Sequence, residues 1–149
     1  SGVWQVVRVS DGDTLKVRNG SQQETIRFCG IDAPELDQPL GKQSRDFLKR
    51  LVDRAGGRVR VQAVKRDRYD RLVGEVFVAA PTRDHPEQER LLDYEQVAAG
   101  MAYVYRRYVK ECPNGDILSR GEAEAKRLKR GVWRDPQAVK PWDYRRLNR

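Results

Sequence analysis

Apolar and polar residues alternate through much of the first 80 residues, and this pattern predicts β-strands. Residues 14–18 alternate clearly and lead into Asn19-Gly20, a pair typical of a tight hairpin turn. Counting pairs outward from that turn places Asp13 opposite Ile26 and beside Arg27. The pattern as a whole predicts five strands, at residues 3–9, 14–18, 22–29, 58–65 and 72–79.

Helix signals mark three other segments. Residues 41–55 carry an apolar stripe with a period of three to four positions, which predicts a helix between the third and fourth strands. Two more helices are predicted at residues 93–99, with Asp93 as the N-cap, and at residues 116–130. Residues 132–149 show no clear period and are expected to form an irregular tail.

The order of these elements favours an α+β fold, a five-stranded OB-type β-barrel with three α-helices. The barrel would span about residues 3–79, with helix 41–55 inserted into it. The pattern alone does not separate an OB barrel from other α+β barrels. A chain of 149 residues without an internal repeat or a linker indicates one domain over residues 1–149.

Positive charge is concentrated in the last third of the chain. The chain has 30 Lys and Arg residues against 22 Asp and Glu residues, a formal net charge of +8. Residues 1–100 contribute +1 of this excess, and residues 101–149 contribute +7. A basic face suits nucleic acid first and an anionic membrane surface second, although many small basic proteins bind neither. No apolar run approaches the ~20 residues of a membrane-spanning helix, so a membrane protein is not expected.

Histidine content excludes several kinds of catalytic site. His85 is the only histidine, and its neighbours are typical of a solvated loop. Ribonucleases with paired histidines, histidine-rich metal sites and most Ser/His or Cys/His hydrolases are therefore excluded. Catalysis by this chain would have to use carboxylates, arginines and tyrosines, with or without a metal ion.

Three acidic residues can gather around one arginine if the chain folds back on itself. Asp32 lies five residues beyond Arg27 and can approach Asp13 only if the chain reverses near Gly30. Glu35 would then join both aspartates. Carboxylate oxygens without His or Cys favour Ca²⁺ or Mg²⁺ over Zn²⁺. The spacing is equally consistent with acids that only form turns and caps.

A second arginine is predicted at the mouth of the barrel. The segment Asp67-Arg68-Tyr69-Asp70-Arg71 lies in the turn between the fourth and fifth strands. Two fixed guanidinium groups and a cation can hold a phosphodiester whose oxygens gain negative charge during cleavage.

The chain resembles the staphylococcal nuclease (thermonuclease) family in five ordered motifs. They extend over most of the chain, from Val3 to about Trp133, and their order makes the resemblance specific. The motifs are Asp11-Gly12-Asp13-Thr14, Ile26-Arg27 to Glu35, Asp67-Arg68-Tyr69-Asp70-Arg71, Val97-Ala98-Ala99-Gly100-Met101-Ala102, and Ala123 to Trp133.

The resemblance implies Ca²⁺-dependent cleavage of DNA and RNA to products with 3′-phosphate ends. It implies that Asp13 and Asp32 bind Ca²⁺ through carboxylates and that Ala33 contributes a backbone carbonyl. It further implies that Glu35 orients or deprotonates the attacking water. Arg27 and Arg71 would contact the phosphate, with Arg71 nearer the leaving 5′ oxygen.

The family resemblance also points to residues that would bind substrate, and it is not complete. Arg68, Tyr69, Tyr103 and Tyr105 match positions that touch phosphate or base. Asp70 replaces the usual glycine and adds a negative charge near the site. Residues 36–40 replace the lysine-rich loop that some members carry after the acidic motif. This difference is expected to affect the affinity for nucleic acid and the preferred substrate length more than the cleavage reaction.

Cysteines and aromatic residues outside the motifs leave further alternatives. Cys29 and Cys112 could form a disulfide, which suits a secreted or exported enzyme whose leader is absent from this sequence, or remain a buried and an exposed thiol. Residues 142–146 could stack bases and bind phosphates, or they could strap onto their own domain. Trp4 and Trp133 are expected in the core.

These observations favour a calcium-dependent nuclease that acts on DNA and RNA. We expect a monomer that prefers single strands and does not bind membranes. The alternative from another class is a non-catalytic OB-fold module that binds single-stranded nucleic acid. An adaptor for anionic membranes has only the basic surplus in its favour. Because Arg27, Asp32, Glu35 and Arg71 are all present, the sequence favours the enzyme.

Overall fold

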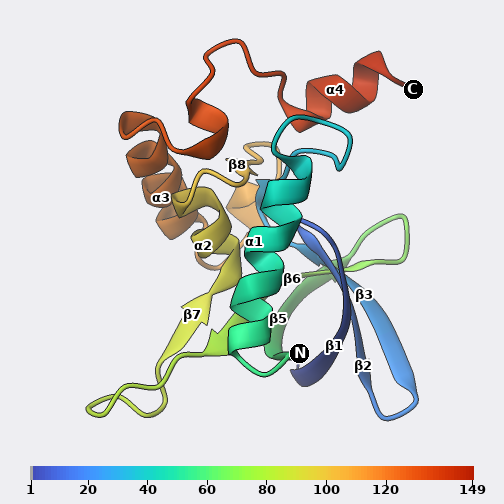
Figure 1. Ribbon diagram of the computed structural model, residues 1–149. Coiled ribbons are helices and arrows are strands. Elements are labelled where there is room, and N and C mark those ends of the chain that lie inside the picture. Colours follow the sequence, from blue (N-terminus) through green and yellow to red (C-terminus); the bar gives the residue numbers. More distant parts are fainter. Residues whose placement is uncertain (1) are drawn as a thin grey trace.

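Five strands form a closed barrel around one apolar core (Figure 1). The computed structural model describes residues 2–149, and its barrel strands are β1 (Gly2–Asp11), β2 (Thr14–Asn19), β3 (Gln22–Phe28), β5 (Arg58–Arg66) and β6 (Leu72–Ala79). Neighbours run antiparallel in the order β3-β2-β1-β5-β6, and a parallel pairing of β3 with β6 closes the barrel. The predicted α+β fold with a five-stranded barrel is confirmed.

The alternation of the strands determines which side chains form the core. Leu15, Val17 and Ile26 are completely or almost completely buried, while Lys16 between the first two is exposed. Trp4 is buried, as predicted, whereas Trp133 is only half-buried. The inserted helix α1 (Gly41–Arg54) packs against β1 and ends within one residue of its predicted boundary.

The register of the β2–β3 hairpin differs from the prediction. Asn19 pairs with Gln22, so the loop residues are Gly20 and Ser21 instead of Asn19 and Gly20. Gly20 has a φ of 61°, a left-handed conformation that glycine adopts without a steric penalty. The predicted pairing of Asp13 with Ile26 is therefore wrong.

Asp13 instead lies just before β2, where its carbonyl accepts a hydrogen bond of 2.9 Å from the Phe28 amide. It thus remains beside Arg27, as the sequence predicted, although the pairing that led to this prediction is shifted. The shift arises because a tight turn can be centred on either side of Gly20, and the local sequence does not distinguish the two.

A sharp reversal after β3 brings the acidic motif back to the barrel. Gly30 has a φ of 77°, and the chain turns there into the short strand β4 (Ile31–Asp32). β4 pairs with β8 (Tyr103–Val104), so that Asp32 lies opposite Tyr103. The predicted reversal near Gly30 is confirmed. A further short strand, β7 (Glu89–Leu91), extends the sheet beyond β6.

The two predicted helices after the barrel are present as α2 (Leu92–Ala98) and α3 (Gly115–Arg127). Asp93 is not the N-cap of α2, because Leu91 occupies that position. The carboxylate of Asp93 is instead buried and accepts a hydrogen bond of 2.9 Å from the Val76 amide. Burial raises the pKa of Asp93 well above its usual value.

A fourth helix, α4 (Pro141–Leu147), lies in the segment predicted to be an irregular tail, so the prediction of three helices is wrong. Two turns are too short to show a clear apolar period, and most of the α4 side chains are polar. Figure 1 shows α4 next to the loop that precedes α1. A hydrogen bond of 2.9 Å from the Gln38 side chain to the Val139 carbonyl links the two segments.

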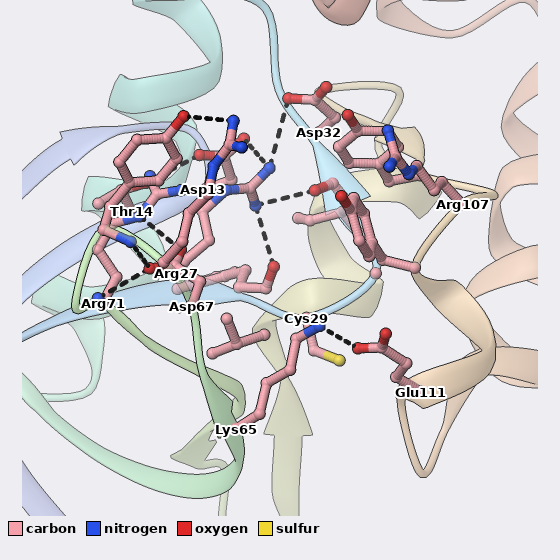
Figure 2. Close-up of a pocket in the computed structure, with 18 of the residues that line it drawn as sticks. Asp13, Thr14, Arg27, Cys29, Asp32, Lys65, Asp67, Arg71, Arg107 and Glu111 are labelled. Atoms are coloured by element: carbon pink, nitrogen blue, oxygen red, sulfur yellow. Dashed lines mark hydrogen bonds and ion pairs between the residues drawn. The ribbon is translucent and has the colours of Figure 1, made fainter.

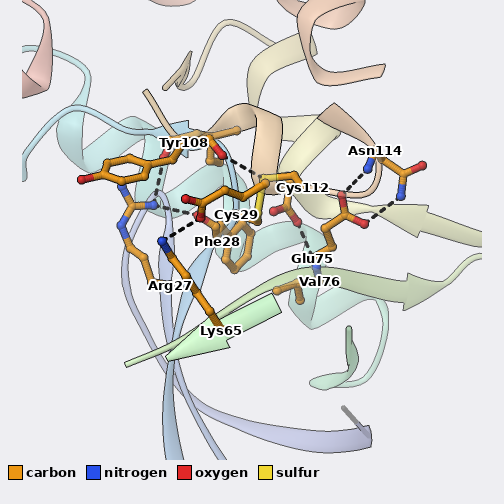
Figure 3. The surroundings of a disulfide bond; sticks show 12 residues. Arg27, Phe28, Cys29, Lys65, Glu75, Val76, Tyr108, Cys112 and Asn114 are labelled. Atoms are coloured by element: carbon orange, nitrogen blue, oxygen red, sulfur yellow. Dashed lines mark hydrogen bonds and ion pairs between the residues drawn. A yellow bond between two sulfur atoms is a disulfide. The ribbon is translucent and has the colours of Figure 1, made fainter. Parts of the chain in front are cut away.

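A disulfide joins the end of β3 to the segment before α3 (Figure 3). Cys29 and Cys112 are both buried, and their Cα atoms are 5.9 Å apart. The predicted bridge is confirmed. None of the helices in residues 2–149 is long and apolar enough to cross a membrane.

Candidate active site

Arg27 is the centre of a buried acidic cluster (Figure 2). Its Nη2 atom lies 3.5 Å from Oδ2 of Asp13 and 3.4 Å from Oδ1 of Asp32. Its Nη1 atom donates to the carbonyls of Phe28 at 3.0 Å and Ile31 at 2.9 Å. Only 13% of the Arg27 side chain is exposed. The reversal at Gly30 therefore positions this guanidinium with oxygens from both sides of the turn.

Asp13 is held in place by the loop that contains Ala33. Its Oδ2 atom accepts a hydrogen bond of 2.7 Å from the Ala33 amide, and its Oδ1 atom accepts one of 3.0 Å from the Thr14 hydroxyl. Burial opposes ionisation of Asp13, but the nearby Arg27 and these hydrogen bonds keep its pKa below the usual value. Asp13 therefore carries a negative charge at neutral pH.

Asp11 is a further member of the cluster that the spacing did not single out as a ligand. Its Oδ1 atom accepts a hydrogen bond of 3.0 Å from the Asp13 amide. Burial, together with the adjacent charge of Asp13, raises the pKa of Asp11 to about 8. Asp11 and Asp13 thus carry less than two negative charges at neutral pH.

Asp32 and Glu35 both contact Arg145 of α4. Arg145 donates from Nη2 to Oδ2 of Asp32 at 2.7 Å, and from Nη1 to Oδ1 of Asp32 at 3.0 Å and to Oε1 of Glu35 at 2.8 Å. Burial raises the pKa of Asp32 to about 6, although the hydrogen bonds from Arg145 oppose this rise. The hydrogen bonds with Asp32 raise the pKa of Arg145 above its already high value.

Arg145 was not predicted as a site residue. In the sequence, residues 142–146 were notable only for their basic and aromatic side chains. Of the two predicted roles, the contacts confirm that this segment packs against its own domain.

Arg71 projects from the turn between β5 and β6, where Asp67 organises the backbone. One oxygen of Asp67 accepts hydrogen bonds of 2.9 Å from the amides of Tyr69 and Arg71, and the other accepts one of 2.8 Å from Nε of Arg71. Within residues 2–149, neither Nη atom of Arg71 donates to a protein acceptor. Two donors of this guanidinium are thus available to an anion in the cleft.

Arg68 and Tyr69 form an exposed pair on the same turn, with Nη2 of Arg68 donating to the Tyr69 hydroxyl at 2.8 Å. Asp70 has a φ of 63°, which explains why a glycine suits this position. Its side chain is 87% exposed and lies 3.5 Å from Arg66. The added charge of Asp70 therefore faces Arg66 and solvent and does not line the cleft.

Tyr103 and Tyr105, two predicted substrate-binding tyrosines that follow the fourth motif, have different surroundings. Tyr105 lines the cleft, and its ring stacks on Trp142 with centroids 5.4 Å apart. Tyr103 is only 2% exposed and packs edge-on against Trp133 and Trp142. Burial raises the pKa of Tyr103 to about 12. The structure therefore brings Tyr105, but not Tyr103, to the cleft.

These groups surround a cleft of about 830 Å³ with an acidic side and a basic, aromatic side. The acidic side comes from the cluster around Arg27. The basic and aromatic side also contains residues that the sequence analysis did not single out, and these are Lys65, Arg66, Arg107 and Tyr108. They come from β5 and from the segment after β8, which are distant in sequence, so no local motif could have grouped them.

The donors of the acidic side suit a hard cation. Asp13, Asp32 and Glu35 offer carboxylate oxygens, and calcium sites are commonly completed by backbone carbonyls and water. The guanidinium held by Asp32 and Glu35 shows that this position accepts a cation. In the conformation described for residues 2–149, no three acidic, histidine or cysteine side chains are close enough to form a metal site on their own.

Residues 25–135 match the sequence model of the family described as "Staphylococcal nuclease homologue". The chain belongs to this family. The staphylococcal nuclease match contains Arg27, Asp32, Glu35 and Arg71, whereas Asp13 and α4 lie outside the matched residues.

Several bacterial relatives align with nearly the whole chain. The chain is 39% identical over 142 residues to an uncharacterized endonuclease of Escherichia coli O157:H7, an alignment that covers 95% of this chain and 83% of that protein. It is 37% identical over 147 residues to the micrococcal nuclease of Shigella flexneri, covering 97% of this chain and 81% of the relative. Protein ParB of Escherichia coli is 37% identical over 142 residues, with 95% and 78% covered. The chain is thus a nuclease homologue.

Proposed function

We propose that the protein is a calcium-dependent nuclease that hydrolyses phosphodiester bonds of DNA and RNA and leaves 3′-phosphate ends. The observation that carries this proposal is the buried cluster of Asp13, Arg27 and Asp32 at one side of a cleft whose other side is basic and aromatic. Membership of the staphylococcal nuclease family supports it, as do relatives that are named nucleases.

In this proposal the acidic side of the cleft binds calcium. Asp13 and Asp32 contribute carboxylate oxygens, and Ala33 contributes its backbone carbonyl. The Ala33 amide already orients Asp13, so the same short segment would position two of the ligands. When bound, calcium supplies positive charge that offsets the charge developing on the phosphate.

Glu35 orients or deprotonates the water that attacks phosphorus, and the arginines hold the phosphate. Arg27 is rigid because backbone carbonyls fix its orientation. Arg71 has two unused donors, and we place it at the leaving 5′ oxygen. Preorganised donors of this kind stabilise the charge of the transition state without reorganisation.

The remaining cleft residues would bind the rest of the strand. Tyr69 offers a ring face to unpaired bases, and Arg68 offers a charge to phosphate. Tyr105 would offer a ring face once Trp142 no longer stacks on it. Tyr103 would reach a base only if Trp142 moved away from it. We therefore propose a preference for single strands. We also propose that the protein acts as a monomer.

The disulfide supports an exported protein. Bridges such as Cys29–Cys112 persist in oxidising compartments and are rare in the cytosol. We propose a secreted or otherwise exported location on this basis.

One observation favours the alternative of a non-catalytic binding module. Arg145 already pairs with Asp32 and Glu35, so these carboxylates have a structural partner that requires no metal. A module of this kind would bind nucleic acid through the basic side of the cleft and would cleave nothing.

The two functions are separated by incubating plasmid DNA and RNA with the protein in Ca²⁺ or in a chelator. The nuclease predicts degradation in Ca²⁺ only, with product ends that a polymerase extends only after phosphatase treatment. Glu35→Gln is the matched control, because it keeps the size of the side chain but removes its charge. Degradation that survives chelation would contradict the calcium mechanism, and binding without degradation would favour the module.

A further inference from the structure

Three side chains attach helix α4 to the cleft and to the loop before α1. Arg145 donates three hydrogen bonds of 2.7–3.0 Å to Asp32 and Glu35. The Tyr144 hydroxyl donates to Asp37 at 2.7 Å. The Trp142 ring stacks on Tyr105 with an interplanar angle of 13°.

Two of these contacts use groups that the proposed nuclease requires. Arg145 contacts both carboxylate oxygens of Asp32 and one of Glu35. Trp142 covers a ring face of Tyr105 that a base would otherwise contact, and it also packs against Tyr103. The same short helix therefore occupies both the metal side and the base side of the cleft.

We propose that α4 is an autoinhibitory latch, in which the Arg145 guanidinium takes the place of the metal ion beside Asp32 and Glu35. Calcium binding then requires that Arg145 leave, and its departure releases Trp142 from Tyr105. This inference rests on the proposed function, because the latch blocks the groups to which that function assigns calcium and nucleic acid.

Distances show why the two cations exclude each other. Calcium lies about 2.3–2.6 Å from its oxygen ligands. The Arg145 nitrogens lie 2.7 and 3.0 Å from the Asp32 oxygens, so they fill the space that an ion on Asp32 would need. The Arg145 guanidinium and a calcium ion bound to the same carboxylate would also repel each other strongly in a partly buried site.

The latch can open without disturbing the barrel. Pro141 is the only α4 residue that is buried, and the Arg145 side chain is 41% exposed. A helix of seven residues is not stable by itself in water, so α4 depends on its contacts with the cleft. Loss of the Arg145 contacts therefore weakens the whole helix, not one side chain alone.

The closed latch lowers the apparent affinity for calcium. If the open form is a minor fraction of the protein, the apparent Kd equals the intrinsic Kd divided by that fraction. Variants that weaken the latch should therefore bind calcium more tightly, whether or not they change the charge near the site.

The test is isothermal titration of Ca²⁺ into the full chain without nucleic acid. We expect Arg145→Gln to lower the Kd about tenfold, the factor for a latch that is open in about one molecule in ten. Arg146→Gln is the matched control, since Arg146 is the next residue, carries the same charge and, among residues 2–149, forms an ion pair only with Asp143. We expect its Kd to stay within about twofold of the wild type.

A second variant separates the latch from simple repulsion of calcium by Arg145. Trp142→Ala keeps the charge of Arg145 but removes the stack on Tyr105. We expect it to tighten calcium binding about threefold or more, because the open form becomes more populated. Hydrogen exchange of the wild type should show that Ca²⁺ speeds exchange of the α4 amides but not of the α3 amides.

The outcomes distinguish failure of the latch from failure of the nuclease. The wild type, Arg145→Gln and Trp142→Ala could all cleave nucleic acid and bind calcium with the same Kd, with no change of hydrogen exchange in α4. This result would overturn the latch and leave the nuclease intact. Calcium binding by Arg145→Gln but not by the wild type would support the latch. Absence of calcium binding in all variants would overturn both.

Discussion

At the scale of single residues, the charge of the acidic cluster is smaller at neutral pH than its number of carboxylates implies. Asp11 is half-buried beside the buried Asp13, and of these two aspartates only Asp13 forms an ion pair with Arg27. Ionisation of Asp13 therefore disfavours ionisation of Asp11. A divalent cation would favour ionisation of both, so calcium binding should release protons below about pH 8.

This arrangement predicts the effect of Asp11→Asn on stability. The folded protein keeps a proton on Asp11 up to about pH 8, whereas the unfolded chain loses it near pH 4. Asp11 thus makes its full favourable contribution to the free energy of unfolding below pH 4, and this contribution is lost as the pH rises to 8. In chelator, the wild type should lose up to about 1.4 kcal/mol per pH unit relative to Asp11→Asn over this range.

Urea unfolding of both proteins at several pH values measures this difference. A difference in the free energy of unfolding that is constant from pH 4 to pH 8 would show that Asp11 titrates normally in the folded protein.

Arg71 offers a test of the proposed chemistry. Arg71→Gln should lower kcat about 10²- to 10³-fold, because a fixed donor to the transition state is typically worth 3–4 kcal/mol. Calcium affinity should be nearly unchanged, since Arg71 pairs with Asp67 and not with the acidic cluster. Asp32→Ala should instead weaken calcium binding, with partial recovery of the rate in excess Ca²⁺. Near-normal turnover of Arg71→Gln would remove this arginine from the mechanism.

Asp70 is a site of backbone strain beside Arg71. Asp70→Gly should raise the free energy of unfolding by about 0.5–1 kcal/mol, because glycine adopts the left-handed conformation at φ 63° without a Cβ clash. Asp70→Ala is the control, since it removes the carboxylate but keeps the Cβ atom. Equal effects of the two substitutions in thermal unfolding would assign the change to charge and not to the backbone.

At the scale of elements, the segment between β8 and α3 depends on distant partners. It carries Arg107 and Tyr108 to the cleft, yet it contains only a short 3-10 helix, Val109–Glu111. Lys65 of β5 forms an ion pair of 2.7 Å with Glu111, and the disulfide fixes Cys112 to the end of β3. The bridge therefore attaches one side of the cleft to the barrel.

Removal of the bridge should destabilise the protein substantially. The double variant Cys29→Ala with Cys112→Ala should lose about 3–5 kcal/mol of unfolding free energy, because the bridge closes a long loop in the unfolded chain. Urea unfolding of oxidised protein measures the loss, and a thiol assay should detect no free thiol before reduction. A loss below about 1 kcal/mol would contradict this account.

At the scale of the whole molecule, the positive charge of the last third is only partly directed at the cleft. Arg107 and Arg145 both line the cleft, and Arg145 belongs to the proposed latch α4. Other basic residues, such as Arg127 on α3, form ion pairs on the outer surface. Net charge alone would therefore overestimate the number of contacts with a bound strand.

The salt dependence of binding measures how many phosphates the protein contacts. Glu35→Gln with Ca²⁺ should bind a single-stranded oligonucleotide without cleaving it. Contact with about three phosphates predicts that the affinity falls roughly 20-fold between 50 and 200 mM salt. Fluorescence anisotropy at several salt concentrations checks this value. A fall of 1000-fold or more would require a binding surface that extends far beyond the cleft.

The sequence by itself determined the features that depend on local spacing. Alternation and β-rich runs placed the five barrel strands, helical spacing placed α1, and Gly30 marked the reversal that joins Asp32 to Arg27. These predictions succeeded because strand and helix periods are set by the backbone over a few residues. The motif residues around Arg27 and Arg71 were identified through their family resemblance, and their catalytic roles stay predictions.

The tertiary structure alone decided the features that depend on distant partners. α4 has only two turns, so it is stable through docking on Asp32, Glu35 and Tyr105 and not through its own period. Asp93 became a buried acceptor instead of a cap because the Val76 amide offered it a hydrogen bond. Arg145 follows Asp32 by 113 positions in the sequence, and no local pattern records a contact over that separation.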